Sequence, residues 1–412
     1  MRLVPPVLRV RTYREIWLGS LASNGGTWLQ IVAAGFLIWE LTGSALAVGF
    51  LAVTARGPSV VLAPLAGQLA DRFDRRRLAV VAFTAQSVAA SALALTAALG
   101  ALSVPVIYVL STILWSGFAL GLPSMLALIP LLVPREHFSQ AVTVNAAGIN
   151  VARLIGPAIG GVVLALAGPA WCFGVNAASY WVLIAALIRA GAPPAPAPKQ
   201  RATVRDGLRY AMADVALRRL LLGMAVFTTF AAVIQELAPV INGRLDGGAV
   251  ELGALLSAMG GGGVVGAVIY ERLRGIGVGA STLLPTASAV FALGLFLIAV
   301  SPWVWLTLPV MGFCGAFWIW LFSGTNTSIQ LRSSRDYVGR MLGFYQLAVV
   351  GGIGLGSLVA GAVAARIGIA QTLAIWAAIL LAWGLWSFVN RVPEIDEPSA
   401  ENTIPAGPGA AT

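Results

Sequence analysis

Long apolar runs recur along almost the whole chain, and they leave very few folds open. Read against turn and charge signals, they give twelve candidate spans between residues 15 and 390. A helix needs about 20 apolar residues to cross the hydrocarbon core of a bilayer. Charged residues make up only 10% of the chain, against about 25% in soluble domains. The sequence therefore predicts an all-α membrane protein with twelve transmembrane helices.

The distribution of positive charge predicts the orientation in the membrane. Of the 26 lysines and arginines, 22 fall in segments that alternating spans would place on one side. Two, Arg244 and Arg366, fall on the other side, and Arg56 and Arg153 fall inside spans. Cytoplasmic loops carry an excess of basic residues. We therefore expect a multi-pass protein of the cell (inner) membrane with both termini in the cytoplasm, and no nucleic-acid partner.

The two halves of the sequence repeat. Residues 131–168 match residues 331–368 at an offset of 200, which aligns Gly161 with Gly361. Earlier in each half the offset is 204, which aligns Gly49 with Gly253. We expect two pseudo-symmetric six-helix bundles at residues 1–190 and 217–392. Between them, residues 191–216 predict a cytoplasmic linker with an amphipathic helix, and residues 393–412 predict a disordered cytoplasmic tail.

One short loop carries the clearest motif. Residues 67–77, GQLADRFDRRR, put six charges into eleven positions between two apolar runs, so they must lie at a membrane surface. The pattern G-x-x-x-D-R-x-x-R-R resembles the loop between helices 2 and 3 of the major facilitator superfamily. Its DRxDRRR form is similar to the drug and siderophore exporters of that superfamily. The GPAIGG string at residues 156–161 also resembles the GPxxGG element of its exporters, and the resemblance covers about residues 10–392.

The resemblance implies a conformational latch and a hinge. Asp71 would meet the start of the eleventh span, where free amide groups favour an anion, and would hold the cytoplasmic side closed. The remaining latch and hinge residues that the motifs imply are Gly67, Arg72, Arg75 and Arg76 in the loop and Gly156, Pro157, Gly160 and Gly161 in span 5. The alternatives are that the arginines only set topology and that the glycines only pack helices.

Arg56 and Arg153 are the strongest chemical signal, because each lies about eleven or more residues from either end of its span. A charge at that depth costs several kcal/mol unless it meets water or a partner. We expect a positive cavity that binds an anionic or hydroxyl-rich ligand, with Asn150 on the face of Arg153. A buried structural ion pair is the alternative.

Span 1 carries a polar stripe at helical spacing. The stripe is formed by Ser20, Ser23, Thr27 and Gln30, with Asn24 beside it. One polar face on an apolar helix predicts the lining of an aqueous cavity, or else contact with a neighbouring helix. Asn24, Thr27 and Gln30 therefore join the predicted substrate-binding set.

Acids within the spans are few, and they limit the candidates for proton coupling. Glu236 in span 7 is the first candidate and Glu40 at the end of span 1 is the second. A buried carboxylate suits proton exchange. Interfacial placement is the alternative reading for both.

These features together predict a secondary active transporter. We expect alternating-access export of a siderophore, an antibiotic or a related metabolite by proton-coupled antiport, as in multidrug efflux. A proton-coupled importer of a small anionic metabolite and a non-transporting membrane sensor are the alternatives. Besides the substrate, protons and membrane lipids we expect no partner, and we predict a monomer. We expect no enzymatic activity, no cofactor and no metal, since Cys172 and Cys314 stand alone and no nucleotide-binding motif is present.

Overall fold

The structure is a computed structural model that describes residues 5–190, 204–334 and 336–391. Helices form all of the regular structure in this part of the chain, and twelve of them are long and apolar enough to cross a membrane. The prediction of an all-α protein with twelve spans is confirmed. The helices are α1 (Arg11–Thr42), α2 (Ala45–Arg72), α3 (Arg75–Ala98), α4 (Val104–Leu128), α5 (Phe138–Ala167), α6 (Pro169–Arg189), α7 (Val204–Ala213), α8 (Val215–Ala231), α9 (Val233–Glu236), α10 (Ala238–Arg244), α11 (Ala249–Gly275), α12 (Ala280–Val300), α13 (Val304–Arg332), α14 (Val338–Ile367) and α15 (Ile369–Val389).

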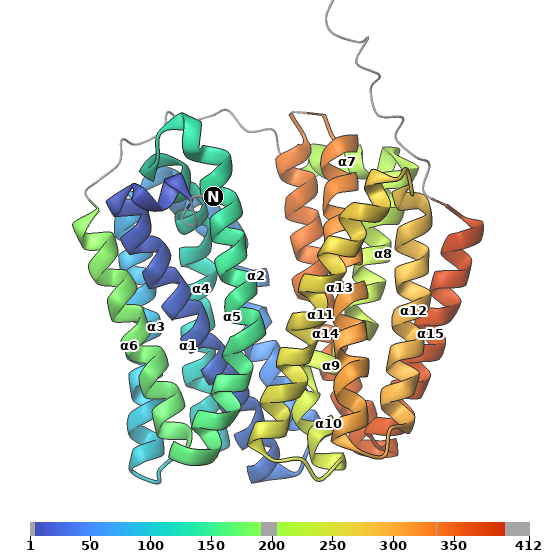
Figure 1. Cartoon of the computed structure of the whole chain (residues 1–412), viewed down its shortest axis with the longest axis horizontal. Coiled ribbons are helices and arrows are strands. Elements are labelled where there is room, and N and C mark those ends of the chain that lie inside the picture. The colour runs from blue at the N-terminus through green and yellow to red at the C-terminus, as the bar shows by residue number, and fades with distance from the viewer. Residues whose placement is uncertain (1–4, 191–203, 335, 392–412) are drawn as a thin grey trace, which may run out of the picture.

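The long helices form two bundles that stand side by side (Figure 1). Helices α1 to α6 make the N-terminal half, and α8 to α15 make the C-terminal half. The N terminus lies at the end of the molecule where the chain leaves α6 and returns at α7 (Figure 1). We call this the terminal end, and the opposite one the far end. The proline-rich start of the predicted linker and the predicted tail lie outside the described residues.

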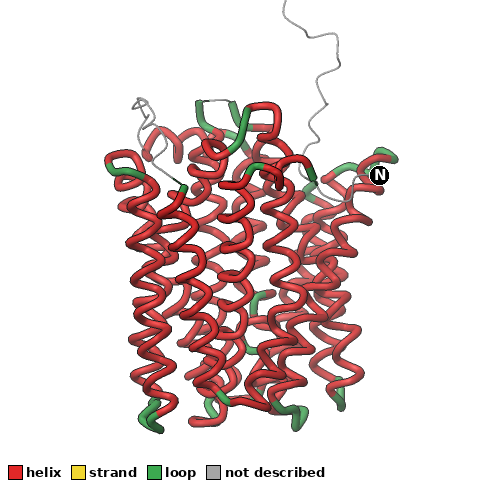
Figure 2. Tube along the Cα trace, turned by 60° about the vertical axis from the view of Figure 1, so that its left-hand side comes forward, coloured by secondary structure: helices red, strands yellow, loops and turns green. Residues whose placement is uncertain are grey.

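Span 7 is not one continuous helix. The chain forms three pieces, α8, α9 and α10, interrupted at Ala232 and Leu237. Figure 2 shows loop segments at this depth, inside the bundle, besides those at its two ends. Pro239 has no N–H to continue the helical hydrogen bonds, which is why the helix ends and restarts here. Through Pro239, α10 then packs against Gly35 of the N-terminal half, where an added Cβ would lie 2.9 Å from the proline ring.

The halves touch at two equivalent helix crossings, α5 with α11 and α14 with α2. At the first crossing, Gly161 of α5 lies against the carbonyl of Ala249. At the second, Gly361 of α14 lies against the carbonyl of Ala45. These positions are related by the sequence offsets of 200 and 204, so the repeat is built into the interface. Only glycine lets the two backbones come this close.

The same helix faces are exposed nearer the terminal end. Along α5, Pro157 and Gly161 pack on α11, whereas Asn150 and Ala147, about two and three turns from Pro157 toward the terminal end, are exposed. Along α11, Gly253 and Gly260 are buried while Val264 and Val268 are exposed. The halves are therefore in contact toward the far end and separate toward the terminal end.

Candidate functional site

A polar pocket lies between the halves, just beyond the α5–α11 crossing. The space between its lining residues, open solvent included, is about 420 Å³. Asn150 and Arg153 of α5 line it together with Gln235 of α9, and Trp28 and Trp318 form aromatic walls. The expectation that Asn150 shares a face with Arg153 agrees with this geometry.

Arg153 is a cation that has no partner among the residues that the structure describes. Within the described residues its guanidinium has no hydrogen bond and no ion pair, and its Nε atom is buried. A guanidinium offers five N–H donors, and leaving them unsatisfied inside a span is unfavourable. The chemistry of the pocket therefore favours a ligand that brings a carboxylate, a phosphate or several oxygen acceptors.

The backbone around Arg153 is unusual because Pro157 follows four residues later. A proline lacks the N–H that would bond the Arg153 carbonyl, and this carbonyl lies against the Cα of Gly260 on α11. One residue further along, the backbone N–H of Ala158 donates to Ser257 Oγ across the interface, at 2.8 Å. The GPAIGG element thus frees backbone groups of α5 from hydrogen bonds within the helix, and these groups contact α11 of the other half.

Arg56 is a cation with a partner. Its Nη2 atom lies 2.6 Å from Glu236 Oε1, and the pair joins α2 of one half to α9 of the other. The two side chains are 24% and 13% exposed, so the pair is shielded from bulk solvent. The Arg56 guanidinium also lies 5.6 Å from the centre of the Trp115 ring, a cation–π distance. Glu236 ends α9, next to the interruption at Leu237.

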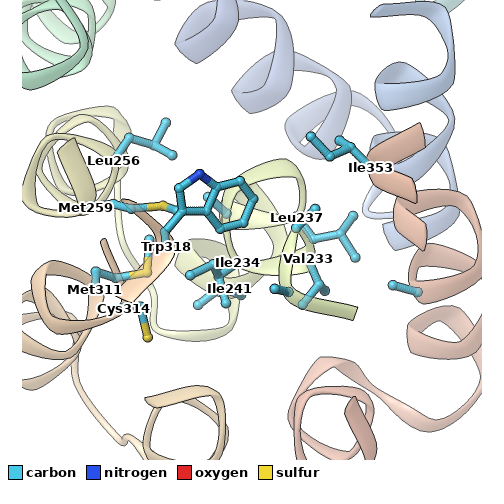
Figure 3. Close-up of a cluster of buried hydrophobic side chains, with 14 of the residues drawn as sticks. Val233, Ile234, Leu237, Ile241, Leu256, Met259, Met311, Cys314, Trp318 and Ile353 are labelled. Atoms are coloured by element: carbon cyan, nitrogen blue, oxygen red, sulfur yellow. The ribbon is translucent and has the colours of Figure 1, made fainter. Parts of the chain in front are cut away.

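Both arginines come from the N-terminal half. At the equivalent positions the C-terminal half has Gly260 for Arg56 and Ile353 for Arg153. Figure 3 shows the apolar side chains that the C-terminal half brings to this region, with Trp318 beside Met259. The polar groups of the site are therefore asymmetric on a symmetric backbone.

The polar stripe on α1 differs from the expected cavity lining, because it faces α6. Gln30 is 3% exposed, and its Oε1 accepts a hydrogen bond from Asn176 Nδ2 at 2.6 Å. Thr27 Oγ1 lies 3.2 Å from the hydroxyl of Tyr180, and Asn24 Nδ2 donates to the Ser20 carbonyl of its own helix. Helix α6 comes this close because Gly26 leaves room for it: a Cβ there would meet Asn176.

Glu40 lies apart from the polar pocket. It is exposed near the end of α1, and no hydrogen bond or ion pair to another described residue holds it. Interfacial placement, the alternative reading, fits this position.

The structure describes only part of the predicted latch. Gly67, Asp71 and Arg72 are not among the residues whose side chains it describes. Arg75 and Arg76 both contact the N-terminal half: Arg75 Nη1 reaches the carbonyl of Ala127, and Arg76 Nη1 donates to that of Ile188 at 3.1 Å. Both carbonyls belong to the last turns of helices, where arginines are favourable. Asp74 caps α3 by accepting from the backbone N–H of Arg77.

The predicted hinge residues face two ways. A Cβ at Gly156 would meet Trp28, and one at Gly160 would lie 3.1 Å from the Cα of Leu29, so both face α1. Pro157 and Gly161 face α11 instead. The element thus joins three helices. Sequence reasoning did not single out Trp28 or Gln235 for the site, and only their proximity to span 5 in the fold identifies them.

Comparison with known proteins agrees with this fold. Residues 4–408 match the family described as transmembrane secretion effector. The enterobactin exporter EntS of Escherichia coli strain 536 is 29% identical over 363 residues, which cover 86% of this chain and 85% of the relative. The enterobactin exporter EntS of Shigella boydii serotype 4 matches at the same identity and coverage.

Solved structures with the same fold are more distant in sequence. A bacterial homologue of the human lysosomal transporter Spinster, in an inward-facing and unoccupied conformation, superposes with a TM-score of 0.73 at 14% identity, covering 94% of this chain and 97% of that one. The D-xylose-proton symporter superposes with a TM-score of 0.73 at 15% identity, covering 94% and 98%. At these identities the likeness shows the fold alone.

Proposed function

This chain belongs to the transmembrane secretion effector family of the major facilitator superfamily, in the branch that holds siderophore exporters, and we propose that it exports a small organic molecule from the cytoplasm by alternating access. The observation that carries the proposal is Arg153, which has no partner among the described residues and lines a pocket between two symmetric halves. A ligand there would contact both halves, so its binding could favour their movement relative to one another.

The chemistry of the pocket narrows the cargo. Arg153 and Asn150 suit oxygen acceptors, and the indoles of Trp28 and Trp318 suit a flat ring. A siderophore, an antibiotic or a related metabolite with acidic or hydroxylated rings fits these groups. The relatives named as enterobactin exporters favour the siderophore within this class.

From the positive-inside pattern we infer that the terminal end faces the cytoplasm. The halves are separate at that end, so this conformation would receive cargo from the cytoplasm. Release on the other side would require the α5–α11 and α14–α2 crossings to open. Protein of this kind would reside in the inner membrane as a multi-pass monomer.

Coupling to protons is assigned to the Arg56–Glu236 pair. Protonation of Glu236 would neutralise the carboxylate and break a short ion pair that links the halves. A cargo whose hydroxyl groups donate to Glu236 needs the carboxylate ionised, so it competes with the proton, which is antiport. A cargo whose carboxylate takes Arg56 instead favours protonated Glu236, so it binds together with the proton, which is symport.

This difference in sign gives a direct test. Cargo is added to the purified protein in a weakly buffered solution, and the pH change is recorded. Export by antiport predicts proton release, and the variant Glu236→Gln abolishes it. Proton uptake would instead favour import of an anionic metabolite. Flux in proteoliposomes, with and without a pH gradient, then separates a transporter from a sensor, which would bind cargo without gradient-dependent flux.

A further inference from the structure

A second pocket lies inside the C-terminal half, away from the interface. It sits at the terminal end between α8, α12, α13 and α15, and the space between its lining residues, open solvent included, is about 500 Å³. Arg219, Trp383 and Trp386 line it, together with hydroxyl groups that include those of Ser288 and Thr325. It shares no lining residue with the pocket of Arg153.

The N-terminal half has closed the equivalent space. By the sequence offsets, Gly19 and Leu183 correspond to Gly223 and Trp383. In the N-terminal half, a Cβ on Gly19 would come within 2.9 Å of the Cα of Leu183, so α1 packs directly on α6. A Cβ on Gly223 would lie 3.7 Å from the Trp383 ring, which is an ordinary contact distance. Helix α8 therefore lies farther from α15 than α1 lies from α6, and the pocket occupies the space between α8 and α15.

The polar groups of this pocket are only partly satisfied. Arg219 Nη1 donates to the carbonyls of Asn390 and Arg391, at 3.2 and 3.1 Å, and its other nitrogens make no hydrogen bond to the described residues. Ser288 and Thr325 are each 3% exposed, and neither hydroxyl has a partner in the part of the chain that the structure describes. The pocket thus offers donors to a ligand that carries several oxygen acceptors.

The surroundings define the ligand further. Arg391 is exposed beside Arg219, which donates to its carbonyl, so the mouth is basic. Trp386 is 44% exposed and stacks on Trp383, with 4.9 Å between the ring centres. Tryptophan at the end of a span is typical of the headgroup region of a bilayer. Leu284 and Leu321 add apolar surface to the wall of the pocket.

We propose that this pocket binds one acidic phospholipid from the leaflet at the terminal end. The phosphate lies at Arg219, and the ester carbonyls accept hydrogen bonds from Ser288 and Thr325, which lie deeper along their helices. One acyl chain follows the apolar wall beside Trp383. This site does not depend on which cargo is exported.

The test counts lipids on the full-length protein. Purified protein is transferred to mixed micelles that hold phosphatidylglycerol and phosphatidylcholine, and native mass spectrometry counts the lipids that stay bound. We expect one phosphatidylglycerol to be retained in preference to phosphatidylcholine. Arg219→Gln should weaken this retention about tenfold, the size of a lost charge-assisted contact. Arg218→Gln removes the same charge one residue away and should change it less than about twofold.

A second variant fills the pocket without touching its charges. Gly223→Leu should abolish retention of phosphatidylglycerol, and a melting temperature close to that of the original protein shows that the variant folds. If Gly223→Leu does not fold, Ser288→Leu tests the same point. Equal retention of both lipids, equal losses in Arg218→Gln and Arg219→Gln, or unchanged retention in the filled pocket would each overturn the proposal. Displacement of the lipid by inorganic phosphate at equal concentration would assign the site to a free anion instead.

Discussion

The α5–α11 crossing and the α14–α2 crossing share one backbone contact but differ in how they hold charge. In each, a glycine lies against a carbonyl of the other half, and an arginine of the N-terminal half lies nearby. At the α14–α2 crossing the arginine is Arg56, which Glu236 neutralises. At the α5–α11 crossing it is Arg153, which has no described partner.

This difference separates the packing of the two halves from the binding of charge. The sequence repeat alone would predict the same role for both crossings. The shared glycine contacts serve the fit between the halves, because they occur twice. The arginines have no counterpart in the C-terminal half, so we expect them to serve a step that has a direction or that involves a single ligand. Each position in one half therefore has a natural control in the other.

The largest effect is expected at Arg153. Arg153→Ala should lower flux about thirtyfold or more, because removal of one member of a buried charge contact costs roughly 2–5 kcal/mol. Its equivalent, Ile353→Ala, removes only apolar contacts and should leave flux within about threefold. Proteoliposome flux and ligand affinity are measured for both. Wild-type flux in Arg153→Ala would remove its assigned role.

The next effect should be equal at the two crossings. Gly161→Ala and Gly361→Ala each place a methyl group against a carbonyl of the other half. Overpacking of this kind costs about 1–3 kcal/mol, so each variant should populate the present conformation less. A cysteine introduced at exposed Ala147 reports this as slower labelling. Unequal effects would mean that the two contacts are not equivalent.

A smaller effect is expected from breaking the ion pair between Arg56 and Glu236. Glu236→Gln removes the charge that neutralises Arg56, and gradient-driven flux should fall about tenfold. Flux without a pH gradient should change little, and its pH dependence should flatten. Glu40→Gln, an acid that is exposed at the end of α1, is the matched control. A loss of flux in Glu40→Gln as large as that in Glu236→Gln would undo the distinction between them.

The smallest effect concerns the start of the two halves. Asp214 caps α8 through the backbone N–H groups of Ala216 and Leu217, whereas the equivalent Val10 leaves α1 uncapped. Asp214→Ala should lower stability by about 1 kcal/mol, and Val10→Asp should raise it by a similar amount. Thermal unfolding measures both. No change in either variant would contradict the capping argument.

The contribution of Asp214 should depend on pH. Partial burial raises the pKa of its carboxyl, but the hydrogen bond from Arg332 and those from the backbone lower it more, so the net pKa lies below its usual value of 3.8. A lowered pKa means that the stabilisation is present above the unfolded value and is lost as pH falls through the folded one. The difference between wild type and Asp214→Ala should therefore disappear in strong acid, and a constant difference would be evidence against the ionised cap.

Much of the fold could be predicted from the sequence. Apolar length and basic loops give the spans, and the offsets of 200 and 204 align Gly161 with Gly361 and Gly49 with Gly253. These are the residues at the crossings, since only glycine satisfies that close contact. The interruption of span 7 was not predicted, although Pro239 marks it, because a proline in a membrane helix can also be accommodated by a bend.

The site could be predicted only in part. Depth within a span singled out Arg56 and Arg153, and the scarcity of acids in the spans singled out Glu236, but the ion pair joins residues 180 positions apart. Periodicity showed that α1 has a polar face, yet it cannot show which neighbour covers that face. The sequence does not show that Gln30 pairs with Asn176 of α6, and this pairing is what turns Gln30 away from the cavity.

The crossings of glycine and carbonyl also bear on how freely the halves can turn. Side chains that interlock across a crossing would have to separate and repack in every transport cycle. At Gly161 and Gly361 no side chain has to move, because backbone packs directly on backbone. The energy barriers of the cycle would then come mainly from the groups that bind cargo and proton, where they can control the timing of each step.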